Sequence, residues 1–178
     1  ESGKTEMVDE VYYTQSLLED VSLLIDGLAE SKGLKFETKI DETIPYQMKG
    51  AVAQIREILT NVLNNAVKYT KEGTVTLEVI CESRTEDRVK LVLVVRDTGI
   101  GMKKEDLEKL YEKFTQFDSK ANRNVEGTGL GMFIVKGLVD QMGGEIEVES
   151  EYGEGTQISV RLEQQIVNAQ PIGEVKLN

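Results

Sequence analysis

The chain has 178 residues but no histidine, and only one cysteine and two prolines. Without histidine it has no histidine general base, no serine triad that depends on histidine and no histidine-ligated metal. The single cysteine, Cys81, excludes an internal disulfide framework and a cysteine metal cluster, and it favours a reducing compartment. Any chemistry in this chain must therefore use carboxylates, amides, cations and the backbone.

Long apolar runs and an excess of positive charge are also lacking. No run approaches the roughly 20 apolar residues that span a bilayer, and no signal peptide opens the sequence, so we expect no direct membrane contact by this domain. The net charge is −11, from 21 Lys and Arg against 32 Asp and Glu. Binding to nucleic acid or to an anionic membrane surface would need the opposite sign.

Composition and periodicity indicate one globular domain, because 39% of the residues are hydrophobic and 30% are charged. Apolar spacing predicts long helices over 15–32, 51–69 and 128–142, with a short helix over 105–111. Strands are expected over 8–14, 34–40, 74–82, 89–97, 145–150 and 156–162, with a turn around Pro45. We therefore expect an α+β fold, a two-layer α/β sandwich in which three helices cover one face of a mixed sheet.

The two ends of the chain lack the regular sequence patterns of the middle. The sequence lacks an initiator methionine, so we expect it to be cut from a longer protein, with 1–7 as a remnant of an upstream helix or linker. The domain is expected over 8–163. Residues 164–178 show no period and contain one of the two prolines, which predicts a frayed tail or linker.

Glycine is concentrated late in the chain, where ten of the 16 glycines fall between Gly99 and Gly155. Three groups stand out: DTGIG at 97–101, GTGLG at 127–131 and GEGT at 153–156. The second group opens a predicted helix, whose free N–H groups and dipole favour an anion. It lacks the preceding strand of a dinucleotide-binding loop, and no P-loop occurs. A glycine-rich hinge without a ligand remains the alternative.

A polar stripe lies along the predicted helix 51–69, formed by Glu57, Asn61, Asn65 and Lys68. Such a stripe is usually a solvated face, but asparagine is a poor helix former, and two asparagines four residues apart are unusual there. An amide oxygen is a hard neutral ligand suited to Mg²⁺ bound with phosphates, and a lysine one turn later can meet a phosphate.

Asp97 ends a strand that is expected to be buried, and TGIG follows it at once. An Asx turn or a helix cap would be sufficient to explain an aspartate here. The functional interpretation is a buried carboxylate that accepts a hydrogen bond from a ligand amino group.

The order of these segments resembles the catalytic ATP-binding domain of sensor histidine kinases. NVLNNAVKYT at 61–70, DTGIGM at 97–102, EKFTQFD at 112–118, GTGLGM at 127–132 and GEGT at 153–156 are similar to the N, G1, F, G2 and G3 boxes of that family. The resemblance covers residues 4–163. It implies the Bergerat ATP-binding fold, which is shared with gyrase, MutL and heat-shock chaperone ATPases.

The resemblance also implies roles around the adenine and the metal. Asp97 would accept from the adenine amino group with help from Thr156 through water, and Tyr69 would lie beside the base. Asn65 would be the Mg²⁺ ligand, with Asn61 nearby. The glycines that allow a close turn over the base would be Gly99 and Gly101.

The phosphate end of the nucleotide would be held by Lys68 and by an ATP lid over 118–131. Arg123 resembles a lid arginine near the terminal phosphates. The glycine-rich group would place backbone amides on the phosphates at Gly127, Gly129, Leu130 and Gly131. The implied catalytic residues are Asn61, Lys68 and Arg123. Phe114 and Phe117 resemble the pair that packs the lid and docks the phosphoacceptor domain, with plain core residues as the alternative.

Three features depart from the family pattern. The phosphoacceptor histidine is absent, so this chain cannot phosphorylate itself. Glu126 stands where a further glycine is common, which brings a carboxylate close to the expected phosphate site, and Met132 stands where leucine is usual.

The resemblance implies a protein-histidine kinase of two-component signalling. Such a kinase binds Mg-ATP and donates the γ-phosphoryl group to a histidine on a separate dimerisation domain, reaching a response regulator indirectly. We expect this fragment to be monomeric and cytoplasmic. The sequence leaves open whether the parent protein is anchored in a membrane. The alternatives are an ATP hydrolase of the same superfamily, a nucleotide-free pseudokinase module and an acidic adaptor without a ligand. The hydrolase is disfavoured because Asn61 stands where a glutamate would act as the general base.

Overall fold

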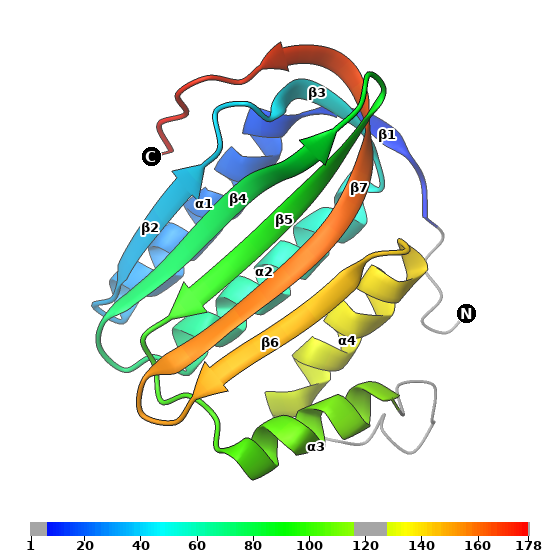
Figure 1. Ribbon diagram of the computed structural model, residues 1–178. Helices are drawn as coiled ribbons and strands as arrows, with labels where there is room; N and C mark the ends of the chain where they lie inside the picture. Colours follow the sequence, from blue (N-terminus) through cyan, green and yellow to red (C-terminus); the bar gives the residue numbers. More distant parts are fainter. Residues whose placement is uncertain (1–6, 116–127, 178) are drawn as a thin grey trace.

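A seven-stranded sheet forms one layer of the computed structural model, and helices cover one of its faces (Figure 1). The structure describes residues 7–115 and 128–177. The helices are α1 (Thr14–Ser31), α2 (Val52–Lys68), α3 (Lys104–Thr115) and α4 (Thr128–Gln141). The strands are β1 (Glu10–Tyr13), β2 (Lys35–Ile40), β3 (Pro45–Gly50), β4 (Thr74–Arg84), β5 (Arg88–Asp97), β6 (Glu145–Glu151) and β7 (Gly155–Pro171).

The sheet is mixed, as expected. Its strand order is β1-β3-β7-β5-β4-β2, and β6 also pairs with β7. The β2–β4 pair is parallel, and the other pairs are antiparallel. In Figure 1, α1, α2 and α4 lie behind the sheet and α3 lies at its end beside β6. The predicted two-layer α/β sandwich with three covering helices is therefore confirmed, and α3 is a fourth helix, longer than the expected 105–111.

The main difference from the sequence-based expectation lies in β7, which continues to Pro171. One edge of β7 pairs with β5, while the other edge pairs first with β6 and then, over its last residues, with β3. Residues 164–171 are therefore strand rather than a frayed tail, and β3 replaces the expected simple turn at Pro45. Periodicity missed residues 164–171 because they pair through the backbone while most of their side chains stay exposed.

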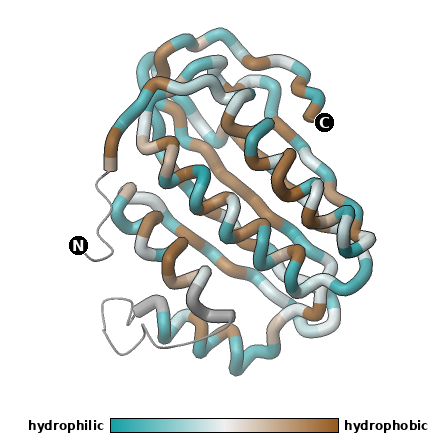
Figure 2. Tube along the Cα trace, turned by 180° about the vertical axis from the view of Figure 1, so that it is seen from behind, coloured by the Kyte–Doolittle hydropathy of each residue, from teal (hydrophilic) through white to brown (hydrophobic). Residues whose placement is uncertain are grey.

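Helix α2 lies at the centre of the hydrophobic core. Its apolar residues recur every three or four positions, and Ile58, Leu59, Val62 and Leu63 are almost fully buried. The helix contacts α1 and α4 on either side, and β4 and β5 beneath it. Figure 2 views this helical layer from behind and shows hydrophobic and hydrophilic residues alternating along the helices. Among the described helices, none is both long and apolar enough to cross a bilayer.

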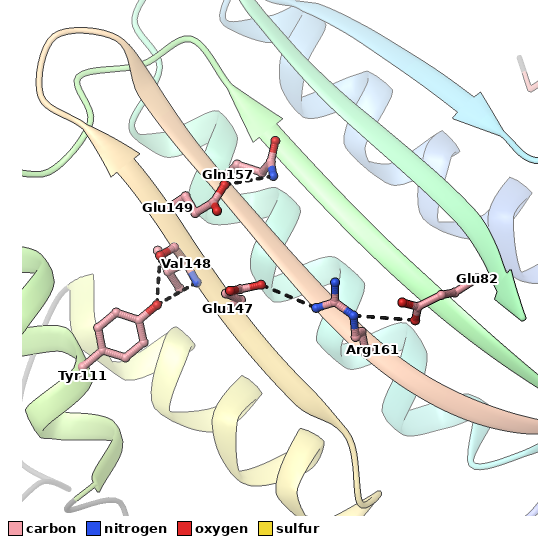
Figure 3. Close-up of polar contacts among 7 residues, drawn as sticks. All are labelled: Glu82, Tyr111, Glu147, Val148, Glu149, Gln157 and Arg161. Carbon is pink, nitrogen blue, oxygen red and sulfur yellow. Dashed lines mark hydrogen bonds and ion pairs between the residues drawn. The ribbon is translucent and has the colours of Figure 1, made fainter.

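Charged side chains cover part of the sheet face that carries no helix. Val92 and Val94 lie outside the core cluster yet are only 6% and 4% exposed. Arg161 on β7, the partner of Val92 in the register, reaches Glu147 on β6 at 3.5 Å and Glu82 on β4 at 3.6 Å (Figure 3). The long arginine stem covers the apolar strand while its guanidinium stays in water. This arrangement explains why β5 is apolar on both faces without a second helical layer.

The segment beyond residue 163 is fixed to the core by a buried hydrogen bond. The Tyr12 hydroxyl donates to Gln164 Oε1 at 2.8 Å, and both side chains are buried. Burial also raises the pKa of the Tyr12 phenol well above its ordinary value. The bond joins edge strand β1 to β7 across β3, so β1, β3 and the end of β7 are held as a unit.

We expect Tyr12→Phe to lower the free energy of unfolding by about 1–3 kcal/mol, because it leaves a buried Gln164 oxygen unpaired. Urea denaturation measures this loss. Tyr13→Phe is the matched control, since Tyr13 is 49% exposed, and we expect it to change stability by less than about 0.5 kcal/mol. Equal stabilities for the two variants would contradict the anchoring role of the bond.

Candidate functional site

A cavity of about 440 Å³ lies between α2, α3 and the end of β5. Its walls are mostly apolar, and a small number of polar groups converge on it, as is common for small-molecule sites. The polar side chains that line it are Asn65, Tyr69, Asp97, Asp106, Lys109, Lys113 and Thr156. Four of these, Asn65, Tyr69, Asp97 and Thr156, are residues that the sequence predicted for one site.

Asp97 occupies the end of β5 with its two carboxylate oxygens in different surroundings. The backbone N–H groups of Gly99 and Thr156 both donate to Oδ1, at 2.9 and 3.2 Å. Within the described residues, Oδ2 accepts no hydrogen bond from the protein. Burial raises the pKa of Asp97, and the two N–H donors oppose that shift without cancelling it. The carboxylate therefore presents one oxygen as an acceptor at the cavity wall.

Glycine is required where the loop after β5 meets the β6–β7 hairpin. Gly101 lines the cavity with a φ of +71°, and a Cβ there would collide with the carbonyl oxygen of Glu151. At Gly99 a Cβ would collide with the carbonyl oxygen of Tyr69, so only a glycine lets the loop after β5 pack this closely against the backbone that follows α2. These close contacts are possible because glycine lacks a side chain.

Helix α2 brings its two predicted asparagines to the first turn of α4. Asn65 lines the cavity, and a Cβ on Gly131 would lie 3.5 Å from its Nδ2 and 3.7 Å from Asn61 Oδ1. Asn61 donates through Nδ2 to the backbone carbonyl of Glu57 at 2.9 Å. A Cβ at Gly131 would thus make only ordinary contacts, and α4 lies close to both amides, whose oxygens have the hard, neutral character that Mg²⁺ accepts.

Tyr69 follows α2 and is one of the residues that line the cavity. Its hydroxyl oxygen is buried and has no hydrogen-bond partner in the described part of the chain, and burial raises the pKa of the phenol. Lys68, in contrast, is exposed and does not line the cavity. Its Nζ lies 5.6 Å from the centroid of the Tyr69 ring, so the structure places Lys68 beside the site rather than within it.

Helix α3 contributes cavity residues that were not predicted from the sequence. Lys109 and Lys113, four residues apart, line the cavity together with Asp106 and Leu110. They escaped notice because α3 is rich in Glu and Lys, as solvated helices usually are. The available signal was the lysine pair at i and i+4 around Leu110, directly after the glycine-rich 97–101 segment. Met132, noted only as a departure from the family pattern, is a buried residue that also lines the cavity.

Several predicted residues are not placed by the structure. Phe117, Arg123, Glu126 and Gly127 lie outside the described residues. Phe114 falls within α3, and Gly129 and Leu130 fall within the first turn of α4. Their predicted roles in holding phosphates or in docking a partner domain therefore stay predictions.

Comparison with known proteins agrees with this geometry. Residues 50–166 match the family model described as histidine kinase-, DNA gyrase B- and HSP90-like ATPase. The sensor protein GacS of Pseudomonas syringae pv. syringae is 36% identical over 162 residues, covering 91% of this chain and 18% of that protein. The histidine-protein kinase BarA of Escherichia coli K12 is 31% identical over 156 residues, which are 88% of this chain and 17% of BarA. The chain thus spans about a fifth of these relatives.

Solved structures share the fold. Full-length ShkA in complex with AMPPNP superposes with a TM-score of 0.72 at 28% identity, covering 92% of this chain and 33% of that chain. The mycobacterial sensor histidine kinase MprB gives a TM-score of 0.63 at 25% identity, covering 90% of this chain and 100% of that chain. The resemblance read from the five sequence boxes is therefore confirmed, and so is the predicted fold.

The raised pKa of Asp97 predicts how its charge affects stability. A folded-state pKa above the ordinary 3.8 means that ionisation of Asp97 opposes folding as the pH rises through and above that value. Asp97→Asn keeps an acceptor oxygen and removes the charge. We therefore expect the nucleotide-free variant to melt at or above the wild-type temperature at pH 7, with a smaller difference at pH 4. Thermal melting at both pH values measures this.

Asp41→Asn is the matched control for this measurement, because the pKa of Asp41 shifts in the opposite direction. Burial raises it, but hydrogen bonds from Thr43 and Cys81 outweigh burial and leave the pKa below its ordinary value. Asp41→Asn should therefore lose stability at pH 7, and lose less as the pH falls through the carboxyl range. A loss of stability at pH 7 for Asp97→Asn would contradict our account of Asp97.

Proposed function

The chain belongs to the family of histidine kinase-, DNA gyrase B- and HSP90-like ATPases, and we propose that it binds Mg-ATP and donates the γ-phosphoryl group to a histidine on a separate dimerisation domain. It is a catalytic domain of the histidine kinase type. The parent would then be a sensor kinase of two-component signalling that reaches a response regulator indirectly.

One observation carries this proposal: Asp97 and Asn65, far apart in sequence, line the same cavity. Asp97 offers Oδ2 as a hydrogen-bond acceptor, which matches the amino group of adenine. Apolar residues such as Val62 and Ile158 also line the cavity and would contact a purine ring. The base would then lie at the end of β5 and the phosphates toward α2 and α4. AMPPNP, the ligand named for ShkA, is a nucleotide of this class.

The phosphate end of the cavity supports a magnesium-bound polyanion. Asn65 would hold the Mg²⁺ through its amide oxygen, with Asn61 close by. The ion would neutralise charge on the phosphates and orient the terminal group. The first turn of α4, which contains Gly129 and Leu130, would direct free N–H groups toward an anion. Phosphoryl transfer needs mainly such positioning and charge stabilisation from the protein.

Cations on α3 add to the predicted phosphate contacts. Lys109 and Lys113 face the cavity, and no carboxylate of the described residues forms an ion pair with either of them. They would attract a polyanion locally although the chain as a whole carries a charge of −11. Lys68 and Arg123, the cations implied by the family resemblance, would complete this set.

The remaining predictions concern the parent protein. Phe114 and Phe117 would dock the phosphoacceptor domain, and the fragment itself would be monomeric, cytoplasmic and without nucleic-acid partners. Residues 1–7 would lead from an upstream domain. The last residues of the domain extend past the predicted boundary at 163, because β7 continues to Pro171.

A nucleotide-free pseudokinase module is a second candidate, and a binding measurement distinguishes the two. We expect Asp97→Asn to weaken binding of AMPPNP with Mg²⁺ by at least about tenfold, because an N–H₂ group then faces the ligand amine in place of an acceptor. Isothermal titration calorimetry measures this change. Glu57→Gln, at an exposed position outside the cavity, should bind like the wild type. Absent heat for all three proteins would support the pseudokinase alternative.

Hydrolysis of ATP is a third candidate, and it needs a base near the terminal phosphate. On α2, Asn65 lines the cavity and Asn61 lies one turn before it, close to Gly131; neither side chain is a base, and Glu57 is exposed. We therefore expect negligible ATPase activity in the wild type and a rise for Asn61→Glu, measured as phosphate release. Asn64→Glu makes the same change at an exposed site on the same helix and should stay at the wild-type rate. Wild-type turnover faster than that of Asn61→Glu would favour the hydrolase.

A further inference from the structure

Ser150 lies next to the end of the cavity that Asp97 and Thr156 line, where the nucleobase would bind, and it is not itself a lining residue. It is the β6 partner of Thr156 in the β6–β7 register. Its Oγ lies 2.7 Å from the backbone N of Met102, 3.1 Å from the carbonyl oxygen of Gly155 and 2.8 Å from Thr156 Oγ1. Ser150 therefore touches the loop after β5, the hairpin turn and a cavity residue at the same time.

The chemistry of these three partners determines where the hydroxyl protons go. The Met102 N–H can only donate, so it occupies one lone pair of Ser150 Oγ. The Gly155 carbonyl can only accept, so it takes the single Ser150 proton. One lone pair of Ser150 Oγ is left for Thr156, and Thr156 must then donate to it. All three contacts are satisfied at once in this arrangement.

The Thr156 hydroxyl has one proton, and in this arrangement it donates that proton in the hydrogen bond to Ser150 Oγ. Thr156 Oγ1 consequently presents lone pairs, and no donor, to the cavity. The neighbouring Asp97 presents Oδ2, also an acceptor, while its Oδ1 binds the Thr156 N–H. Both side chains at the base end of the cavity are thus acceptors.

We propose that Ser150 is a positioning residue that determines base specificity by fixing Thr156 as a hydrogen-bond acceptor. This inference rests on the proposed function, because it concerns the base of a bound nucleotide. A purine with an amino group at position 6 offers two N–H donors to such a site. A 6-oxo purine offers a carbonyl there, which meets two acceptors and no donor, so it is rejected.

The test compares ADP with IDP, both with Mg²⁺, by isothermal titration calorimetry. IDP carries a 6-oxo group and an N1–H where ADP has a 6-amino group and an unprotonated N1. In Ser150→Ala the Thr156 hydroxyl is released and can rotate to donate to the 6-oxo group. We expect the ADP-to-IDP affinity ratio to fall about five- to tenfold, since one hydrogen bond changes its direction. Ser150→Thr keeps the hydroxyl and should restore the ratio. Ser150→Cys, with a weaker acceptor, should give an intermediate ratio, and it serves as the test if Ser150→Ala does not fold.

A second control uses Thr156 itself. In a Thr156→Val background there is no hydroxyl to orient, so adding Ser150→Ala should leave the ratio unchanged. If Ser150 acted in packing alone, Ser150→Ala would lose ADP affinity and IDP affinity equally. An unchanged ADP-to-IDP affinity ratio in Ser150→Ala would therefore overturn this inference while leaving the proposed function intact. A wild type that binds neither nucleotide would overturn the proposed function, and this inference with it.

Discussion

The position of the Asp97 carboxylate is the constraint on which the base end of the site depends. Two backbone N–H groups, from Gly99 and Thr156, converge on one of its oxygens. One donor belongs to the loop after β5 and the other to the start of β7, so the carboxylate joins two segments that are distant in sequence. Burial makes this arrangement unfavourable for the charged form, as the raised pKa shows. A ligand that donates to the second oxygen would recover part of the lost solvation.

The close approach of these segments explains the glycines around the site. Gly155 has a φ of +138°, and a Cβ there would collide with the Asp97 carbonyl oxygen, while Gly101 meets Glu151 in the same way. The Gly153 N–H also donates to the carbonyl of Ile100 at 2.7 Å. The hairpin and the loop therefore form one wall of the cavity. Flexibility is not the reason for glycine at these positions, since close packing alone requires it.

The charge of the molecule is distributed so that an acidic protein can hold an anion. Part of the acidic excess faces water from the helix-free side of the sheet, where Glu82 and Glu147 flank Arg161 (Figure 3). The cavity on the helical side is lined by Lys109 and Lys113 as well as by Asp97 and Asp106, so its charged lining residues balance formally. The two lysines therefore offset the two carboxylates locally, although the chain as a whole carries a charge of −11.

How much could be predicted depended on whether a residue's role was local. The apolar period of α2 and the continuous apolar run of β5 depend on neighbours in sequence, and both elements were predicted within a few residues. Lys109 and Lys113 resemble solvated lysines along the sequence, and only the folded structure shows that α3 brings them to the cavity that α2 also lines. The last part of β7 was missed because its pairing with β3 leaves few buried side chains.

The sequence by itself determined the fold class and the family, and it predicted four polar residues that line the cavity, namely Asn65, Tyr69, Asp97 and Thr156. The order and spacing of five short motifs carried that information, and the absence of histidine removed the main rival chemistries. Only the tertiary structure decided which oxygen of Asp97 is satisfied, which lysines line the cavity and which groups contact the Ser150 hydroxyl. These properties depend on distances between segments brought together by folding, and hydrogen bonding responds to tenths of an ångström that no pattern along the chain records.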